Sequence, residues 1–137
     1  MTPKHYDKPL PVMEPDSRGY WEHARRHRLT VQHCLACGDK HFPPGPVCPH
    51  CLSDRQEWLQ ASGKATLVSW VNFHRAYWDG YRDEVPYNAC LVKLEEGPLV
   101  ISNLAGGIPG NARMGMPLRV VFDDLTDEVS LPRFVPE

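Results

Sequence analysis

The 137-residue sequence predicts a mostly β fold in three parts: an N-terminal arm and short helix over residues 1–30, a rubredoxin-like cysteine ribbon over 31–60 and a five-stranded barrel over 61–137. Three observations predict this fold. Fourteen prolines disfavour long helices. Four cysteines form two closely spaced pairs. After Gly63, short alternating apolar runs are separated by glycine, proline and acidic residues, as antiparallel strands require.

The first part is expected to hold an extended arm and one short helix. Residues 1–15 are rich in proline and lack periodicity, which predicts an arm that lies on this protein or on a partner. Asp16 or Ser17 is placed to cap a helix through residues 20–28. Gly19 disfavours a helix at this point, because glycine has a low helix propensity.

Two Cys-x-x-Cys pairs separated by ten residues are the strongest signal in the chain. Each pair lets two thiolates converge from one tight turn, and Gly38 follows the first pair where a left-handed backbone is often needed. Four sulfur ligands select zinc or iron, and the spacing alone does not distinguish the two metals. Because protein ligands fill a whole tetrahedron, no position is open for water or substrate. The sequence therefore predicts one structural Zn²⁺ ion, held by Cys34, Cys37, Cys48 and Cys51.

The residues after Gly63 predict five short antiparallel strands. The Glu-Glu-Gly-Pro segment at 95–98 is the expected hairpin turn between the second strand and the third. Five short strands in a segment of this length suit a small Greek-key barrel of the OB type. The expected strands are residues 65–73, 87–94, 99–104, 118–122 and 129–134.

Charge and hydropathy restrict the classes of partner. A formal net charge of -2 and a pI near 6.4 give no overall attraction to nucleic acid. The first ten residues contain no apolar signal segment, and no later stretch is apolar enough to span a membrane. We therefore expect a cytoplasmic protein with neither a nucleic-acid nor a membrane partner. In a reducing compartment the four paired cysteines are metal ligands, and the lone Cys90 is expected in the barrel core.

A group of basic residues is the candidate site for phosphate groups. Arg25, Arg28 and Lys40 lie near one another in sequence, and guanidinium groups match phosphate oxygens. The alternative is that these residues form a solvated surface. No nucleophile with an adjacent base, glycine-rich phosphate loop or pair of carboxylates in a cleft is recognisable. The sequence therefore shows no catalytic site of its own.

The segment between the first two barrel strands is rich in aromatic residues. Residues 74–84 carry Tyr77, Trp78 and Tyr81. Aromatic residues on loops often anchor a partner protein or a ligand such as an acyl group. They also serve to close the end of a barrel, and the sequence does not decide between these roles.

The succession of helix, cysteine ribbon and barrel strands resembles the zinc-ribbon/OB-fold proteins associated with acyl-CoA metabolism. The resemblance covers nearly everything after residue 16. It implies a small accessory subunit of a thiolase-like enzyme, whether a thiolase, an acyltransferase or a retro-aldol lyase, that binds or positions a CoA ester. The catalytic residues then belong to the thiolase-like partner. The most specific shared segments are Phe42-Pro43-Pro44, Pro86-Tyr87, Leu94-Glu95-Glu96-Gly97, Gly115-Met116 and Pro132-Arg133-Phe134.

The sequence thus favours a non-catalytic scaffolding subunit with structural Zn²⁺, a CoA ester as ligand and a thiolase-like protein as partner. One alternative is a zinc-ribbon/OB-fold nucleic-acid-binding module, which requires a basic barrel face studded with aromatic residues. The acidic turns at 95–96 and 123–124 disfavour it. The other alternative is a free-standing enzyme that uses the barrel as a pocket, and turnover of acyl-CoA without a partner would identify it.

Overall fold

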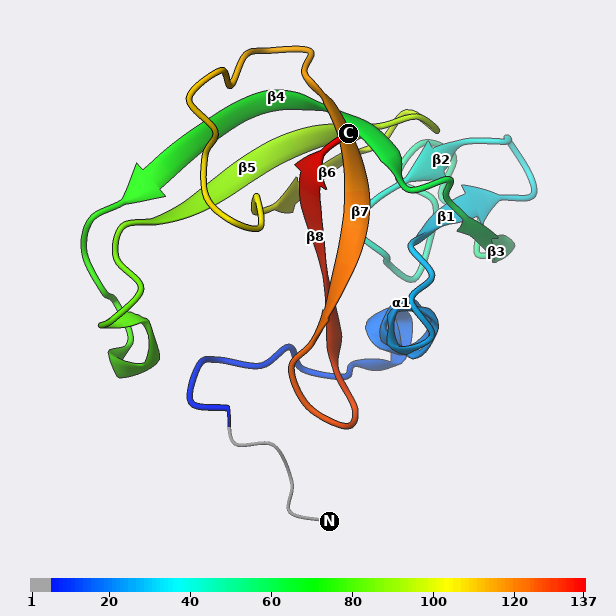
Figure 1. Cartoon of the computed structure of the whole chain (residues 1–137). Coiled ribbons are helices and arrows are strands. Elements are labelled where there is room, and N and C mark those ends of the chain that lie inside the picture. The colour runs from blue at the N-terminus through cyan, green and yellow to red at the C-terminus, as the bar shows by residue number, and fades with distance from the viewer. Residues whose placement is uncertain (1–5) are drawn as a thin grey trace.

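The computed structural model describes residues 6–137 and shows a mostly β chain, as the sequence predicts. Residues 1–5 of the expected arm lie outside the described residues. Figure 1 shows the long curved strands β4 and β5, the β7–β8 pair that crosses them, and the ribbon and helix α1 to one side. In chain order the elements are α1 (Pro15–Arg25), β1 (Thr30–Cys34), β2 (Lys40–His41), β3 (Gln56–Gln60), β4 (Lys64–Phe73), the 3-10 helix η1 (Asp79–Tyr81), β5 (Tyr87–Leu94), β6 (Leu99–Ser102), β7 (Pro117–Asp124) and β8 (Ser130–Pro136).

Helix α1 begins at Pro15, so the expected caps at Asp16 and Ser17 were wrong. Proline is well suited to the first helical position, because its fixed φ is helical and its missing N–H would be unpaired there. Glu14 is the residue that precedes the helix, and the Ser17 hydroxyl donates to its carbonyl oxygen at 3.4 Å.

The far end of α1 also differs from the expected span of 20–28, because the helix ends at Arg25. His27 adopts φ of 58°, and such a left-handed residue terminates a helix. Gly19 lies inside the helix despite its low propensity. A Cβ at that position would lie 2.4 Å from Nε1 of Trp58, so only glycine lets α1 pack this closely on β3.

The ribbon is a three-stranded antiparallel sheet with the order β2-β1-β3. β1 pairs with β3 along its whole length, from Thr30 opposite Gln60 to Cys34 opposite Gln56. β1 therefore delivers the chain directly to the first cysteine, as the sequence predicts.

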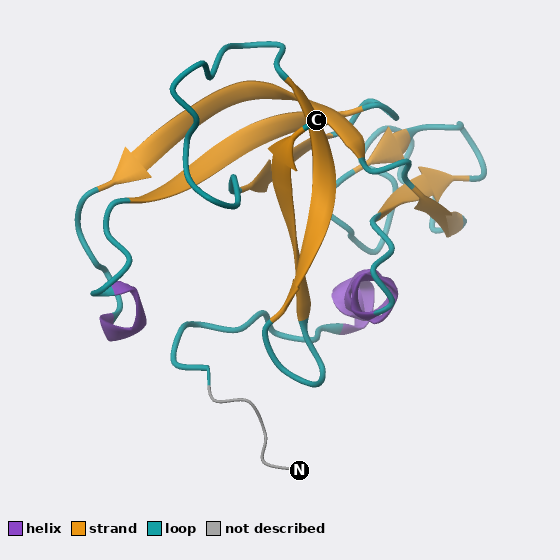
Figure 2. Cartoon of the chain, viewed as in Figure 1, coloured by secondary structure: helices purple, strands orange, loops and turns teal. Residues whose placement is uncertain are grey.

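The barrel is an antiparallel five-stranded sheet with the order β6-β5-β4-β7-β8, and Figure 2 shows how strongly it curls. β5 has the predicted bounds, and the other four strands lie within two residues of theirs. A parallel bridge between Leu104 and Phe134 joins the two edges of the sheet. In it, the Phe134 N–H donates to the Asn103 carbonyl at 3.0 Å, and the Ala105 N–H donates to the Phe134 carbonyl at 2.9 Å. This bridge gives the OB-like closure.

One apolar core connects the three parts. Tyr20 of α1, and Leu29 and Val31 at the start of the ribbon, belong to the same buried cluster as Leu118 and Phe134 of the barrel. The division of the chain into a ribbon over residues 31–60 and a barrel over residues 61–137 remains a prediction. Among the described residues, no helix is long and apolar enough to cross a membrane.

Candidate functional site

The four paired cysteines converge on one point, as predicted. Their sulfur atoms all lie within 4.8 Å of one another. The Sγ atoms of Cys34 and Cys51 are 3.6 Å apart, and those of Cys37 and Cys48 are also 3.6 Å apart. Zinc–sulfur bonds of about 2.3 Å give tetrahedral edges of about 3.8 Å, so the cluster has the dimensions of a four-thiolate zinc site.

Two equivalent turns bring the cysteines together. The N–H of Gly38 donates to the Cys34 carbonyl, and the N–H of Leu52 donates to the Cys48 carbonyl, each at 2.9 Å. The turn residues are left-handed, with φ of 82° at Gly38 and 66° at Leu52. The backbone N–H of Cys37 also donates to Cys34 Sγ at 3.4 Å, and this bond is the largest of the effects that lower the pKa of that thiol to about 6. The backbone thus favours the thiolate form at Cys34, whereas burial and the neighbouring thiols raise the pKa values of Cys37 and Cys51.

His41 lies behind the cluster and supports it. Its buried ring contacts Asp39 Oδ2 through Nδ1 at 3.2 Å and Gln56 Oε1 through Nε2 at 2.5 Å. Ligand atoms of Asp39, His41 and Cys48 also lie within 4.8 Å of one another, but Cys48 already belongs to the four-sulfur group. Both ring nitrogens of His41 contact polar side chains, one of the first cysteine turn and one of β3. The histidine therefore holds in place the loops that present the thiols.

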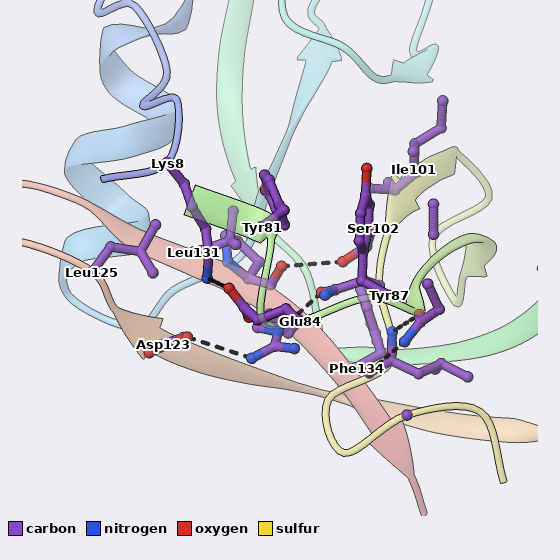
Figure 3. A pocket seen from close by; sticks show the side chains of 18 of the residues that line it. Lys8, Tyr81, Glu84, Tyr87, Ile101, Ser102, Asp123, Leu125, Leu131 and Phe134 are labelled. Carbon is purple, nitrogen blue, oxygen red and sulfur yellow. Dashed lines mark hydrogen bonds and ion pairs between the residues drawn. The ribbon is translucent and has the colours of Figure 1, made fainter. Parts of the chain in front are cut away.

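A cavity of about 680 Å³ lies between the arm, α1 and the barrel, and Figure 3 shows it from close by. Its lining is mainly apolar and aromatic, and residues far apart in sequence contribute to it. Of its aromatic residues, the sequence singled out only one as a functional candidate. The aromatic residues that line the cavity are Tyr6, Tyr20, Trp21, Phe42, Tyr81, Tyr87 and Phe134.

Charged groups at the cavity wall are paired with one another. Lys8 of the arm forms an ion pair with Glu84, as Figure 3 shows. Burial lowers the pKa of Lys8, but the hydrogen bond and charge of Glu84 outweigh this effect and raise that pKa, so Lys8 stays charged. Arg133 donates from Nε to Asn103 Oδ1 at 3.0 Å and from Nη1 to Asp123 Oδ2 at 3.4 Å.

Uncharged polar groups at the wall bond mainly to the backbone. The amide N–H of Asn88 donates to the Leu104 carbonyl at 3.0 Å, and Asn88 Oδ1 accepts from the Leu104 N–H at 2.7 Å. The Ser102 hydroxyl donates to the Pro132 carbonyl at 3.1 Å. The sequence analysis did not predict the cavity. Its available signal was Asn88, a polar residue on the inward-facing side of an apolar strand, because a buried polar group needs partners.

Comparisons with known proteins agree with this architecture. A family model for the ChsH2 rubredoxin-like zinc ribbon domain matches residues 21–56, and one for the ChsH2 C-terminal OB-fold domain matches residues 58–123. A DUF35 domain-containing scaffold protein of Pyrococcus furiosus is 37% identical over 103 residues, which is 74% of each chain. The chain belongs to the ChsH2/DUF35 family.

Two further relatives of this ChsH2/DUF35 chain are larger or form part of an assembly. A probable enoyl-CoA hydratase alpha subunit of Thermomonospora curvata is 34% identical over 94% of this chain. The chain spans only 40% of the length of that subunit. A chain in the solved structure of an Ltp2–ChsH2(DUF35) aldolase is 33% identical, with a TM-score of 0.82, and the match covers 93% of this chain and 98% of that one.

The predicted basic site lies outside the cavity of the ChsH2/DUF35 chain. Arg25 closes α1, Arg28 precedes β1, and Lys40 lies in β2 opposite His33. All three basic side chains are exposed, and none of them lines the cavity. Their role as phosphate ligands remains a prediction.

The aromatic loop divides into two environments. Tyr81 lines the cavity and stacks on Tyr87, with ring centroids 4.6 Å apart. Tyr77 and Trp78 are 58% and 55% exposed. The geometry therefore places Tyr81 at the end of the barrel and leaves Tyr77 and Trp78 available for contact with another molecule.

Proposed function

We propose that this chain is a non-catalytic scaffolding subunit that binds acyl-CoA as part of a complex with a thiolase-like enzyme. The observation that carries the proposal is the similarity to a chain of the Ltp2–ChsH2(DUF35) aldolase, which covers 93% of this chain and 98% of that one. The hydratase alpha subunit relative supports a role in acyl-CoA metabolism. The partner's reaction is of the thiolase, acyltransferase or retro-aldol class.

The metal site supports a structural role. Cys34, Cys37, Cys48 and Cys51 would hold Zn²⁺ with four thiolates, and the ion would then have no position for substrate. Its contribution is to folding, since structural zinc sites typically contribute on the order of 10 kcal/mol. The surrounding residues hold the two turns in place and carry no reaction step.

The outer face of β4, β5 and β6 supports a protein partner. Val71 of β4 lies opposite Ala89, and Leu91 of β5 lies opposite Ile101 of the edge strand β6. Ile101, which also lines the cavity, is 78% exposed, and Val71 is also exposed. An exposed apolar edge is a liability for a monomer and is normally covered in a complex. Trp78 follows β4 closely in the sequence. We take this outer face, together with Trp78, as the candidate interface.

We assign the phosphates of the CoA ester to the exposed basic residues rather than to the cavity. Changing Arg25 and Arg28 together to alanine should weaken CoA binding by the complex about tenfold, because charge-assisted bonds to phosphate are lost. Arg26→Ala is the control, since Arg26 is also an exposed arginine of the same segment. Equal effects of the control and the double variant would remove these residues from the proposal.

The partnership is tested by co-expressing the chain with the thiolase-like proteins of the same organism. We expect a stable hetero-oligomer, and we expect the partner to be insoluble or inactive alone. Trp78→Ala should weaken the complex by about 2 kcal/mol, roughly 30-fold, as an interface anchor does. The melting temperature of the Trp78→Ala chain should change little, because the Trp78 side chain is more than half exposed. Leu35→Ala, at an exposed position of the ribbon, is the control for lost apolar surface.

Three results together would refute the scaffold function. They are a chain that stays monomeric, that binds no thiolase-like protein and that turns over acyl-CoA alone. A cytoplasmic location remains part of the proposal, and fractionation of cells that make the native protein tests it.

A further inference from the structure

We propose that the barrel cavity binds an uncharged, mainly apolar ligand, such as an aromatic or alicyclic ring system or the ring-bearing part of a larger molecule. We also propose that the arm closes over this ligand. The inference is argued from the residues of this chain that line the cavity and does not rest on the proposed partner enzyme.

The size and lining of the cavity fit such a ligand. Its volume of about 680 Å³ lies within the range of about 300–1,000 Å³ that small-molecule sites occupy. Tyr81 and Tyr87 present stacked rings on one side, and Tyr20 and Trp21 of α1 contribute rings on another. Aromatic faces of this kind contact flat or cyclic apolar groups well.

The polar wall disfavours a charged ligand. Arg133 is held by Asn103 and Asp123, and both ends of the Asn88 amide are used by the backbone of Leu104. An apolar ligand that expels water leaves these pairs intact. An anion would need to break the pairs of Arg133 or lie beside the Asp123 carboxylate, and like charges repel each other. The cavity therefore selects against phosphate and carboxylate groups.

The arm packs onto η1 and forms one side of the site. Lys8 pairs with Glu84, and its Nζ lies 5.2 Å from the centre of the Tyr81 ring. A Cβ at Gly80 would lie 2.7 Å from the carbonyl oxygen of Asp7. The backbone of the arm therefore packs directly against the backbone of η1 at a position that has no side chain. In the described part of the arm, Asp7 and Lys8 make these contacts with η1 and Glu84, and breaking them would let the arm move aside for ligand entry.

A matched pair of fluorescent probes tests the selectivity on the full-length, zinc-loaded chain. N-phenyl-1-naphthylamine is neutral, and 8-anilinonaphthalene-1-sulfonate carries the same rings with one added sulfonate. We expect one neutral probe per chain and at least tenfold weaker binding of the sulfonate at the same site. Equal affinities, or several equivalent neutral probes per chain, would overturn the proposal.

Two variants locate the probe. Ala89 lines the cavity, so Ala89→Phe should lower the affinity for the neutral probe at least tenfold. Leu35→Phe is the control, because Leu35 is an exposed apolar residue of the ribbon that does not line the cavity. Unchanged binding by a folded Ala89→Phe protein contradicts the assigned site.

A measurement on the unmodified protein keeps the test decisive if the first variant does not fold. In methyl NMR spectra, the neutral probe should shift the signals of Val100, Leu104 and Leu131, which line the cavity, and leave that of exposed Val71 unchanged. Shifts confined to Val71 and its neighbours would place the probe on the outer surface and refute the proposal.

The arm closure has its own test. Gly80→Ala should displace the arm from η1 and speed dissociation of the neutral probe at least fivefold, because the added methyl group collides with Asp7. Gly110→Ala is the control, since a Cβ there meets no atom within 4 Å. Identical dissociation rates for the two variants would show that the arm does not close the site.

Discussion

Asn88→Ala is the substitution that best tests how the barrel is closed. Asn88 is only 9% exposed, and its amide both donates to and accepts from the backbone of Leu104. Leu104 is fully buried and forms the parallel bridge with Phe134 that joins the two sheet edges. Alanine therefore leaves the buried N–H of Leu104 without a partner, whereas the Leu104 carbonyl still accepts from the Gly107 N–H at 3.3 Å.

The expected loss of stability follows from the unpaired N–H of Leu104. An unsatisfied buried donor costs about 1–3 kcal/mol, so the variant should lose about 2 kcal/mol. A chain of 137 residues has an unfolding entropy of about 0.29 kcal/mol/K. The melting temperature should therefore fall by about 7 °C.

Thermal and urea unfolding of the zinc-loaded protein, followed by circular dichroism, measure this effect. Asn72→Ala is the matched control, because Asn72 lies opposite Asn88 on β4 but is exposed. The control should change the free energy of unfolding by no more than about 0.5 kcal/mol. If the two variants have the same stability, the assigned role of Asn88 in holding the closure is wrong.

Four further predictions concern the metal, the packing, the lone thiol and nucleic acid. Metal analysis of recombinant protein should find one tightly held zinc per chain, and stoichiometric iron or folded metal-free protein would contradict this. Gly19→Ala should destabilise the protein by about 1–3 kcal/mol in urea unfolding, because the new methyl group meets Trp58, whereas Gly110→Ala should not. Cys90 is buried, and burial raises the pKa of its thiol to about 11, so iodoacetamide at pH 8 should label it only after unfolding, as peptide mass analysis can show. Double-stranded DNA should bind weakly or not at all at physiological salt, because the net charge is -2, and a sub-micromolar salt-dependent affinity would favour the nucleic-acid alternative.

The sequence by itself determined the features that depend on local spacing. Two Cys-x-x-Cys pairs specify a sulfur tetrahedron wherever a turn can form, and the four sulfur atoms do converge. The strands were predictable because alternation and hairpin residues act over a few neighbours, and β5 at Tyr87–Leu94 has the expected bounds. The core position of Cys90 followed from the same alternation.

Only the tertiary structure decided the features that depend on distant segments. The start of α1 at Pro15 and the close contact of Gly19 with Trp58 depend on how the helix meets β3. The pairing of Asn88 with Leu104 depends on closure of the barrel, which no local pattern encodes. The cavity is built from the arm, α1, η1 and four barrel strands, so its lining, its internal charge pairs and its selectivity exist only once these segments have packed together.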